Sequence, residues 1–164
     1  MKKRKAVYPG TFDPITYGHI DVVRQASGLF DDVTVLVARN TSKSPLFTCE
    51  ERTAMIRAVF RGSRNVRVDS FEGLLVDYAR RHRIAVVVRG LRAVSDFEHE
   101  FQMALANRKL DPHVETVFLV PHEQNIYLNS TIVREVARLG GDVSAFVPPV
   151  VARRLRAAFR PGDR

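Results

Sequence analysis

Short apolar runs alternate with helical patterns along almost the whole chain, and this alternation is the feature that most constrains its fold. Five runs have the length and composition of strands: residues 5–8, 33–38, 66–70, 84–88 and 115–120. The run 84–88 is apolar throughout, as is typical of a parallel strand buried on both faces. Strands separated by helices need right-handed crossovers. The sequence therefore predicts an α/β fold, a Rossmann-like, doubly wound and mainly five-stranded parallel sheet with helices on both faces.

Capping and stop signals mark the helices between these strands. Residues 48–51 (Thr-Cys-Glu-Glu) and 95–98 (Ser-Asp-Phe-Glu) match the capping-box pattern, and Gly62 matches a helix stop. Asn129 or Ser130 is expected to begin a helix that ends at Gly140-Gly141, and Pro148-Pro149 a last, basic helix at about 149–159. The other helices are expected at about 18–30, from 49 to Gly62, at 74–82 and at 95–110. We expect residues 1–164 to form a single domain.

In open parallel sheets, ligands bind past the carboxyl ends of the strands. The loops after the first, second, fourth and fifth strands are therefore expected to form the site. The first of them precedes a helical pattern, so its glycine and the helix N-terminus direct free N–H groups toward an anion. Its sequence from residue 8 is Tyr-Pro-Gly-Thr-Phe-Asp-Pro-Ile-Thr-Tyr-Gly-His19.

His19 is expected on the first turn of that helix, where it can donate to the same anion. Because a helix N-terminus disfavours the imidazolium, we expect a largely neutral, hydrogen-bonding ring. The alternative is a tight turn in which glycine, proline and aspartate are only turn formers.

The remaining loops add cations and hydroxyl groups. Lys43 lies in the loop after the second strand, Arg89 and Arg92 flank a glycine after the fourth, and Ser130 and Thr131 begin the helix after the fifth. Each of these residues is ordinary on its own: a solvated lysine, surface arginines or helix caps. Their convergence with Thr11 on one edge of the sheet favours a polyphosphate ligand and phosphoryl or nucleotidyl transfer.

Other chemistries lack their motifs. The sequence has no P-loop, no Gly-x-Gly-x-x-Gly and no Gly-x-Ser-x-Gly segment. Glu98-His99-Glu100 resembles metal-ligand spacing, but adjacent helix residues do not share a face. The other histidines show no zinc-type spacing with cysteine. We therefore predict no metal site built from protein side chains.

Charge and cysteine content limit the kinds of ligand and the cellular location that we expect for this chain. The formal net charge is +8, but residues 2–5 and 153–164 carry all of the excess, so the body of the chain is neutral. Since nucleic-acid binders usually carry a basic face across the fold, small anions are the better match. Cys49 is the single cysteine, which fits a reducing cytosol, and no apolar run has membrane length. We expect a cytoplasmic protein that binds neither membranes nor nucleic acid.

These motifs carry a family resemblance. Gly10-Thr-Phe-Asp-Pro14 followed by Thr16-x-Gly-His19 resembles the nucleotidyltransferase superfamily, whose signature is His/Thr-x-Gly-His. Three further segments resemble bacterial phosphopantetheine adenylyltransferases. They are Lys-Ser-Pro-Leu-Phe-Thr-x-Glu-Glu-Arg at 43–52, Arg-Gly-Leu-Arg-Ala-Val-Ser-Asp-Phe-Glu-x-Glu at 89–100, and Val-Arg-Glu-Val-Ala at 133–137 with Gly-Asp-Val at 141–143.

The resemblance implies an activity and its partners. ATP and 4′-phosphopantetheine would give dephospho-coenzyme A and pyrophosphate, by in-line attack on the α-phosphate without a covalent intermediate. Mg²⁺ would be bound mainly through the phosphates of ATP, and coenzyme A is a candidate feedback inhibitor. A homohexamer is also implied, and the apolar stretch 143–147 is a candidate contact surface.

The resemblance also assigns residues. Catalysis would depend on His19, Thr11, Lys43 and Arg92, with His19 stabilising the pentacoordinate α-phosphate. Thr11, Lys43 and Arg89 would hold the phosphate of the acceptor, and Leu75 would line its pantetheine arm. ATP would be held by Thr11, Phe12, His19, Gly90, Leu91, Arg92, Glu100, Asn125, Ile126, Tyr127, Leu128, Asn129, Ser130 and Thr131.

Two segments depart from the family pattern. The usual Ile-Ser-Ser-Ser/Thr is Leu128-Asn-Ser-Thr131 here, although asparagine caps a helix equally well. Residues 123–126 also differ from common members. Two alternatives stay open: an adenylyltransferase for a mononucleotide such as nicotinate mononucleotide, and a nucleotide-binding regulator or RNA-binding module without turnover.

Overall fold

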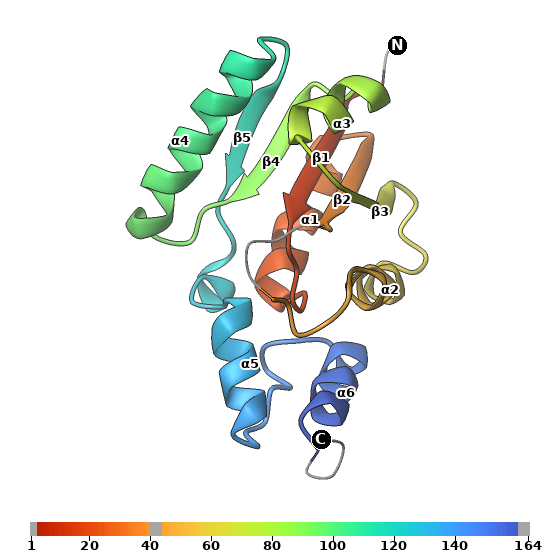
Figure 1. The fold of residues 1–164 in the computed structure, drawn as a ribbon, viewed down its shortest axis with the longest axis vertical. Coiled ribbons are helices and arrows are strands. Elements are labelled where there is room, and N and C mark those ends of the chain that lie inside the picture. Colours follow the sequence, from red (N-terminus) through yellow and green to blue (C-terminus); the bar gives the residue numbers. More distant parts are fainter. Residues whose placement is uncertain (1–2, 40–43, 161–164) are drawn as a thin grey trace.

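The computed structural model describes residues 3–39 and 44–160, so Lys43 lies outside the described residues. Five parallel strands form one sheet in the order β3-β2-β1-β4-β5 (Figure 1). Their bounds are β1 Lys5–Gly10, β2 Asp32–Ala38, β3 Val66–Phe71, β4 Val86–Gly90 and β5 Glu115–Leu119. The strand order reverses between β1 and β4, which is the switch point where such sheets bind ligands.

Helices cover both faces of the sheet, as the sequence predicts. Their bounds are α1 Tyr17–Leu29, α2 Cys49–Val59, α3 Leu75–His82, α4 Val94–Leu110, α5 Ser130–Arg138 and α6 Pro149–Ala158, with a 3₁₀ turn at Glu123–Asn125. In Figure 1, α5 and α6 lie beyond the end of the sheet toward which the arrowheads point. The expected doubly wound α/β fold is confirmed.

Two apolar clusters result from the alternation of side chains along the central strands. On β2, Val33, Val35 and Val37 face the cluster that contains residues of α1, α2 and α6. Leu36 points the opposite way, into the cluster formed with α3. The central strands are therefore buried on both sides, which fixes their register and the position of the loops that follow them.

Two predicted boundaries are wrong. β4 is shifted toward the C-terminus relative to the expected 84–88, so Arg89 and Gly90 end the strand instead of following it. α4 begins at Val94 with Ala93 as N-cap and without a side-chain cap bond, so Ser95 lies inside the helix and is not the N-cap that was expected. The carboxylate of Asp96 instead accepts a hydrogen bond from Arg92, one turn earlier in the chain.

The apolar stretch 143–147, expected as a candidate contact surface, is largely internal. Val143 and Val147 are buried in the core beside α6, and Phe146 packs against that core. Among the exposed large apolar side chains of the described residues, five lie on α4, and they are Phe97, Phe101, Met103, Leu105 and Leu110. Within the described part of the chain, α4 therefore carries more exposed large apolar side chains than any other element.

The two basic segments lie far apart. Lys3–Lys5 leads into the amino end of β1, whereas the arginines of α6 lie beyond the carboxyl ends of the strands (Figure 1). They therefore do not form one basic face. Across residues 3–39 and 44–160, no helix has both the length and the apolar character needed to span a membrane.

Leu36→Ala tests the two-sided core. Leu36 is fully buried, so the truncation removes apolar contacts and leaves a cavity under α3. We expect the free energy of unfolding to fall by about 2–5 kcal/mol in chemical denaturation. Leu139→Ala, at a side chain that is 71% exposed, is the control and should change it by no more than about 0.5 kcal/mol.

Candidate active site

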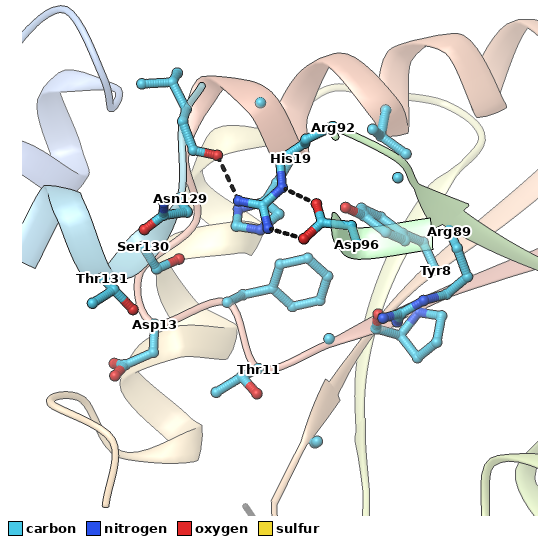
Figure 2. Close-up of a pocket in the computed structure, with 18 of the residues that line it drawn as sticks. Tyr8, Thr11, Asp13, His19, Arg89, Arg92, Asp96, Asn129, Ser130 and Thr131 are labelled. Atoms are coloured by element: carbon cyan, nitrogen blue, oxygen red, sulfur yellow. Dashed lines mark hydrogen bonds and ion pairs between the residues drawn. The ribbon is translucent and has the colours of Figure 1, made fainter. Parts of the chain in front are cut away.

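A cleft of about 820 Å³ opens at the carboxyl ends of the strands. It is lined from all four expected loops: by Gly10 to Asp13 at and after the end of β1, Ala38, Ser44 and Pro45 at and after the end of β2, Arg89, Gly90 and Arg92 at and after the end of β4, and Pro121 and residues 128–131 after β5. Figure 2 shows Thr11, Arg89, Arg92 and Ser130 around one space. The sequence therefore predicted the location of the cleft correctly.

The loop after β1 forms the floor of the cleft. Phe12 has a left-handed backbone (φ 50°), and its ring lies across Gly10, where an added Cβ would come 2.9 Å from the ring. Gly10 is therefore required by this close approach. The Phe12 ring also meets Tyr8 and His19 edge-on, with centroid distances of 5.3 and 5.1 Å.

His19 is the third residue of α1 and takes part in a capping box with Thr16. The backbone N–H of Thr16 donates to Nδ1 of His19 at 3.1 Å, and the backbone N–H of His19 donates to Oγ1 of Thr16. A neutral imidazole carries one proton, so this bond places it on Nε2. The ring is thereby fixed as a hydrogen-bond donor toward the cleft.

The expected neutral state of His19 agrees with its environment, but the cause differs. Burial, followed by the positive charges of Arg92 and Arg89, lowers the pKa of His19 from 6.5 to about 4. The sequence suggested the helix N-terminus as the cause. Protein packing and two guanidinium groups dominate instead.

The two arginines of β4 and the following turn are held by carboxylates of α4. Arg89 forms two bonds to Glu100, from Nε at 2.6 Å and from Nη2 at 2.5 Å, and donates to the carbonyl of Pro9. Arg92 donates from Nε to Asp96 at 3.0 Å and from Nη1 to the carbonyl of Leu128 (Figure 2). Bidentate pairs of this kind fix the plane of a guanidinium group.

The helix start after β5 supplies the remaining wall. The side chain of Asn129 accepts from the N–H of Ile132 at 2.8 Å, so it caps α5 as expected. Ser130 Oγ donates to the carbonyl of Pro14 at 2.8 Å, which ties α5 to the loop after β1. Thr131 also faces the cleft (Figure 2).

Some predicted residues lie elsewhere. Leu75 packs against the cluster under α3, and Leu91, Ile126 and Tyr127 do not line the cleft. Tyr127 is exposed and meets Phe146 edge-on, and Asn125 lines a neighbouring cavity. Glu100 does line the cleft, but its carboxylate is engaged by Arg89.

Several lining residues were not predicted as site residues. Asp96, His99, Glu100 and Met103 follow the spacing of one helix face, and only Glu100 was assigned. Arg134 lies one turn after Ser130, so the same spacing is the signal that would have found it. Tyr8 was not assigned either; burial raises its pKa to about 12, so its hydroxyl stays protonated.

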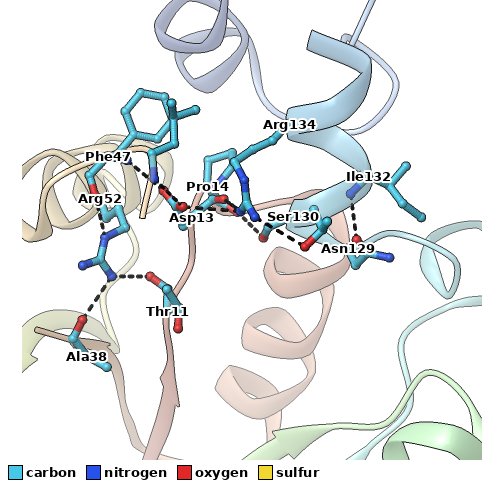
Figure 3. A network of polar contacts seen from close by, with 12 residues as sticks. Thr11, Asp13, Pro14, Ala38, Phe47, Arg52, Asn129, Ser130, Ile132 and Arg134 are labelled. Atoms are coloured by element: carbon cyan, nitrogen blue, oxygen red, sulfur yellow. Dashed lines mark hydrogen bonds and ion pairs between the residues drawn. The ribbon is translucent and has the colours of Figure 1, made fainter. Parts of the chain in front are cut away.

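Arg134 and Asp13 join the helix α5 to the loop after β1 (Figure 3). Arg134 donates to the backbone carbonyl of Asp13 and, at 3.3 Å, to its carboxylate. That carboxylate also accepts from the N–H groups of Leu46 and Phe47, at 2.8 and 3.0 Å. The loops after β1 and β2 and the start of α5 are therefore one connected structure.

Comparison with known proteins first shows the broad protein family. The family model described as cytidylyltransferase-like matches residues 7–136, so the chain is a member of that nucleotidyltransferase family. A solved structure of a putative nicotinate-nucleotide adenylyltransferase from Vibrio parahaemolyticus shares the fold. Its TM-score is 0.71 at 18% identity, with 94% of this chain and 99% of the other covered.

Closer relatives narrow the family. A phosphopantetheine adenylyltransferase of Nitrosomonas eutropha is 57% identical over 152 residues, covering 93% of each chain. The enzyme of that name from Nitrosospira multiformis is 56% identical over 160 residues, covering 98% of this chain and 97% of the relative. The chain therefore belongs to the phosphopantetheine adenylyltransferase family, as the sequence resemblance implied.

The low pKa of His19 makes a testable prediction. The folded protein resists protonating His19 until about pH 4, whereas the unfolded chain takes up this proton near pH 6.5. Between those values the unfolded state binds more protons, so the His19 contribution to stability falls as the pH is lowered. We expect an NMR titration midpoint near pH 4. We also expect wild type to lose stability relative to His19→Asn between pH 6.5 and 4; a His19 midpoint at or above 6.5 would contradict this.

Proposed function

We propose that the protein transfers the adenylyl group of ATP to 4′-phosphopantetheine and releases pyrophosphate, giving dephospho-coenzyme A. The observation that carries this proposal is the convergence of an oriented, neutral His19 with Arg89, Arg92 and a capped helix start on one cleft. The family relatives bear the name of this activity, which supports the same conclusion.

The cleft must hold two anions together against their repulsion. For ATP we propose Thr11, Phe12, His19, Glu100, residues 90–92 and residues 125–131, with the β- and γ-phosphates near Arg92, Ser130 and Thr131. For the acceptor we propose Thr11, Lys43 and Arg89 on its phosphate and Leu75 near its pantetheine arm. Support comes from the wall positions of Arg89 and Arg92 and from the helix start at Ser130, which favours phosphate binding.

Transfer would then be direct. A phosphate oxygen of the acceptor attacks the α-phosphorus, and the bond from that phosphorus to the oxygen bridging to the β-phosphate breaks. His19 would donate its Nε2 proton as a hydrogen bond to the α-phosphate, where negative charge grows in the transition state. Because the ring is neutral and its Nδ1 is occupied by Thr16, this bond needs no proton transfer. Orientation and charge neutralisation supply the catalysis, without a covalent intermediate.

Mg²⁺ is proposed as the cofactor. Within residues 3–39 and 44–160, no three His, Cys, Asp or Glu side chains come together as a metal site. We therefore propose that ATP phosphate oxygens hold the ion, whose role is to neutralise charge on those phosphates.

Assembly, location and regulation belong to the same proposal. A homohexamer is favoured by the exposed apolar side chains of α4, which include Phe97, Phe101 and Leu105. We also propose a cytoplasmic location and inhibition by coenzyme A. Coenzyme A is an adenine nucleotide that carries the same pantetheine arm as the product. Binding to membranes or nucleic acid is not part of the proposal.

Pyrophosphate release tests the function against its alternatives. With ATP and Mg²⁺ present, 4′-phosphopantetheine should support turnover, and nicotinate mononucleotide should support little or none. Turnover with nicotinate mononucleotide instead would identify a mononucleotide adenylyltransferase. Salt-dependent RNA binding without turnover of either acceptor would favour the binding module.

His19→Ala should fold normally and lose turnover far more than ATP affinity. Removing one donor to a charge that develops in the transition state costs on the order of 100- to 1000-fold in rate. Turnover and calorimetric ATP binding are measured together, with the exposed His113→Ala as the control. Near-wild-type turnover in a well-folded His19→Ala protein would remove this residue from the mechanism.

Arg89→Ala should weaken binding of 4′-phosphopantetheine while largely sparing ATP. Arg89 lies at the end of β4 beside the carbonyl of Pro9, and its loss also leaves Glu100 without its guanidinium partner. We expect an increase of at least about tenfold in the acceptor dissociation constant, since a charge-assisted hydrogen bond is worth about 1.5–3 kcal/mol. Calorimetry that shows lost ATP affinity with unchanged acceptor affinity would reverse the assignment. Lys43→Ala, in the loop after β2, is predicted to behave in the same way.

A further inference from the structure

Arg52 lies on α2 and contacts the loop after β1, but it does not line the cleft. Its side chain is only 1% exposed, which makes it the largest of the fully buried side chains. The guanidinium group donates to three backbone carbonyls: those of Thr11 at 2.6 Å, Ala38 at 3.1 Å and Phe47 at 3.1 Å (Figure 3). One side chain thus joins the ends of β1 and β2 to the start of α2.

The charge of Arg52 is not paired with a carboxylate of any residue in the described part of the chain. Among the described residues, no Asp or Glu oxygen lies within 4.0 Å of its guanidinium, whereas Arg89, Arg92 and Arg134 are each paired with a carboxylate. Burying an unpaired cation is costly even when its N–H groups are bonded. A neutral side chain would fill the space at a lower free-energy cost of burial. A positive charge at this position therefore indicates a function that requires it.

The Thr11 carbonyl is the contact that connects Arg52 to the cleft. The Thr11–Phe12 peptide bond is trans, so the carbonyl of Thr11 and the N–H of Phe12 point in opposite directions. Because Arg52 holds the carbonyl, the N–H of Phe12 faces away from Arg52, and both Thr11 and Phe12 line the cleft. No described residue accepts a hydrogen bond from this N–H.

The peptide would not keep this orientation without support. Phe12 has φ 50°, a left-handed conformation that is unfavourable for a residue with a side chain. The ring of Phe12, packed against Tyr8 and His19, supports one side of the peptide. Arg52, through the Thr11 carbonyl, supports the other.

We propose that Arg52 is a positioning residue that aims the N–H of Phe12 at a phosphate of the nucleotide, whose negative charge is the counter-ion of the buried guanidinium. The inference rests on the proposed function and extends it to a residue that never touches substrate. It also explains why an arginine occupies this position: its fork reaches carbonyls on three segments, which the single ammonium group of lysine does not.

Arg52→Lys tests the proposal because it keeps the charge and removes the fork. In calorimetry with Mg²⁺, we expect the dissociation constants of ATP and of pyrophosphate to rise about 10- to 100-fold, the range for one lost hydrogen bond to a charged group. Arg57→Lys is the matched control, since Arg57 lies on the same helix and is exposed. Wild-type affinity for both ligands in folded Arg52→Lys protein would overturn the proposal.

A second measurement does not depend on the stability of the variant. In the wild-type protein, pyrophosphate should shift the backbone amide resonance of Phe12 strongly downfield, and an unmoved resonance under saturation would overturn the proposal. In Arg52→Lys, this shift should shrink while the resonances of residues 130–132 still respond. If wild type binds pyrophosphate with the Phe12 shift but does not turn over 4′-phosphopantetheine, the proposed function fails and the role of Arg52 stands.

Discussion

The carboxylate of Asp13 is the contact on which the rest of the site depends. It accepts the N–H groups of Leu46 and Phe47 from the loop after β2 and the guanidinium of Arg134 from α5. These three segments are far apart in sequence, and each contributes to the wall of the cleft. A carboxylate bonded to several donors within the protein holds its neighbours in one arrangement, so the site is built before any substrate arrives.

The cations of the cleft are also held in place by other groups of the protein. Arg89 and Arg92 are expected to meet phosphates, yet each is already oriented by a carboxylate of α4. Such pairing lowers the net charge of the cleft, but it fixes the planes of both guanidinium groups. The pairing fixes the orientation of the guanidinium groups and weakens their electrostatic attraction for phosphates. A fixed orientation suits a reaction that must align two anions for direct transfer. His19 fits this scheme because burial, and after it the nearby guanidinium groups, lowers its pKa and keeps its ring neutral.

The sequence predicted what depends on short-range pattern. Apolar periodicity located the strands and helices, and the parallel topology then brought the four loops together at one edge. It could not predict pairs set by packing, such as the partnership of Glu100 with Arg89, or the burial of Val143 and Val147. The proposed role of Arg52 could not be predicted from the sequence either. An arginine in a helix is normally exposed, and only the fold shows that Arg52 is buried.

We infer that the protein alone fixes the loop after β1, so that its hydrogen-bond donors already point to the proposed phosphate site. A crystal structure with a non-hydrolysable ATP analogue tests this directly. We predict that the backbone of residues 10–16 keeps its present path and that the bond between Arg52 and the Thr11 carbonyl persists. We also predict that the β- and γ-phosphates lie beside Arg92 and residues 129–131. A rearranged loop, or phosphates bound away from these residues, would contradict it.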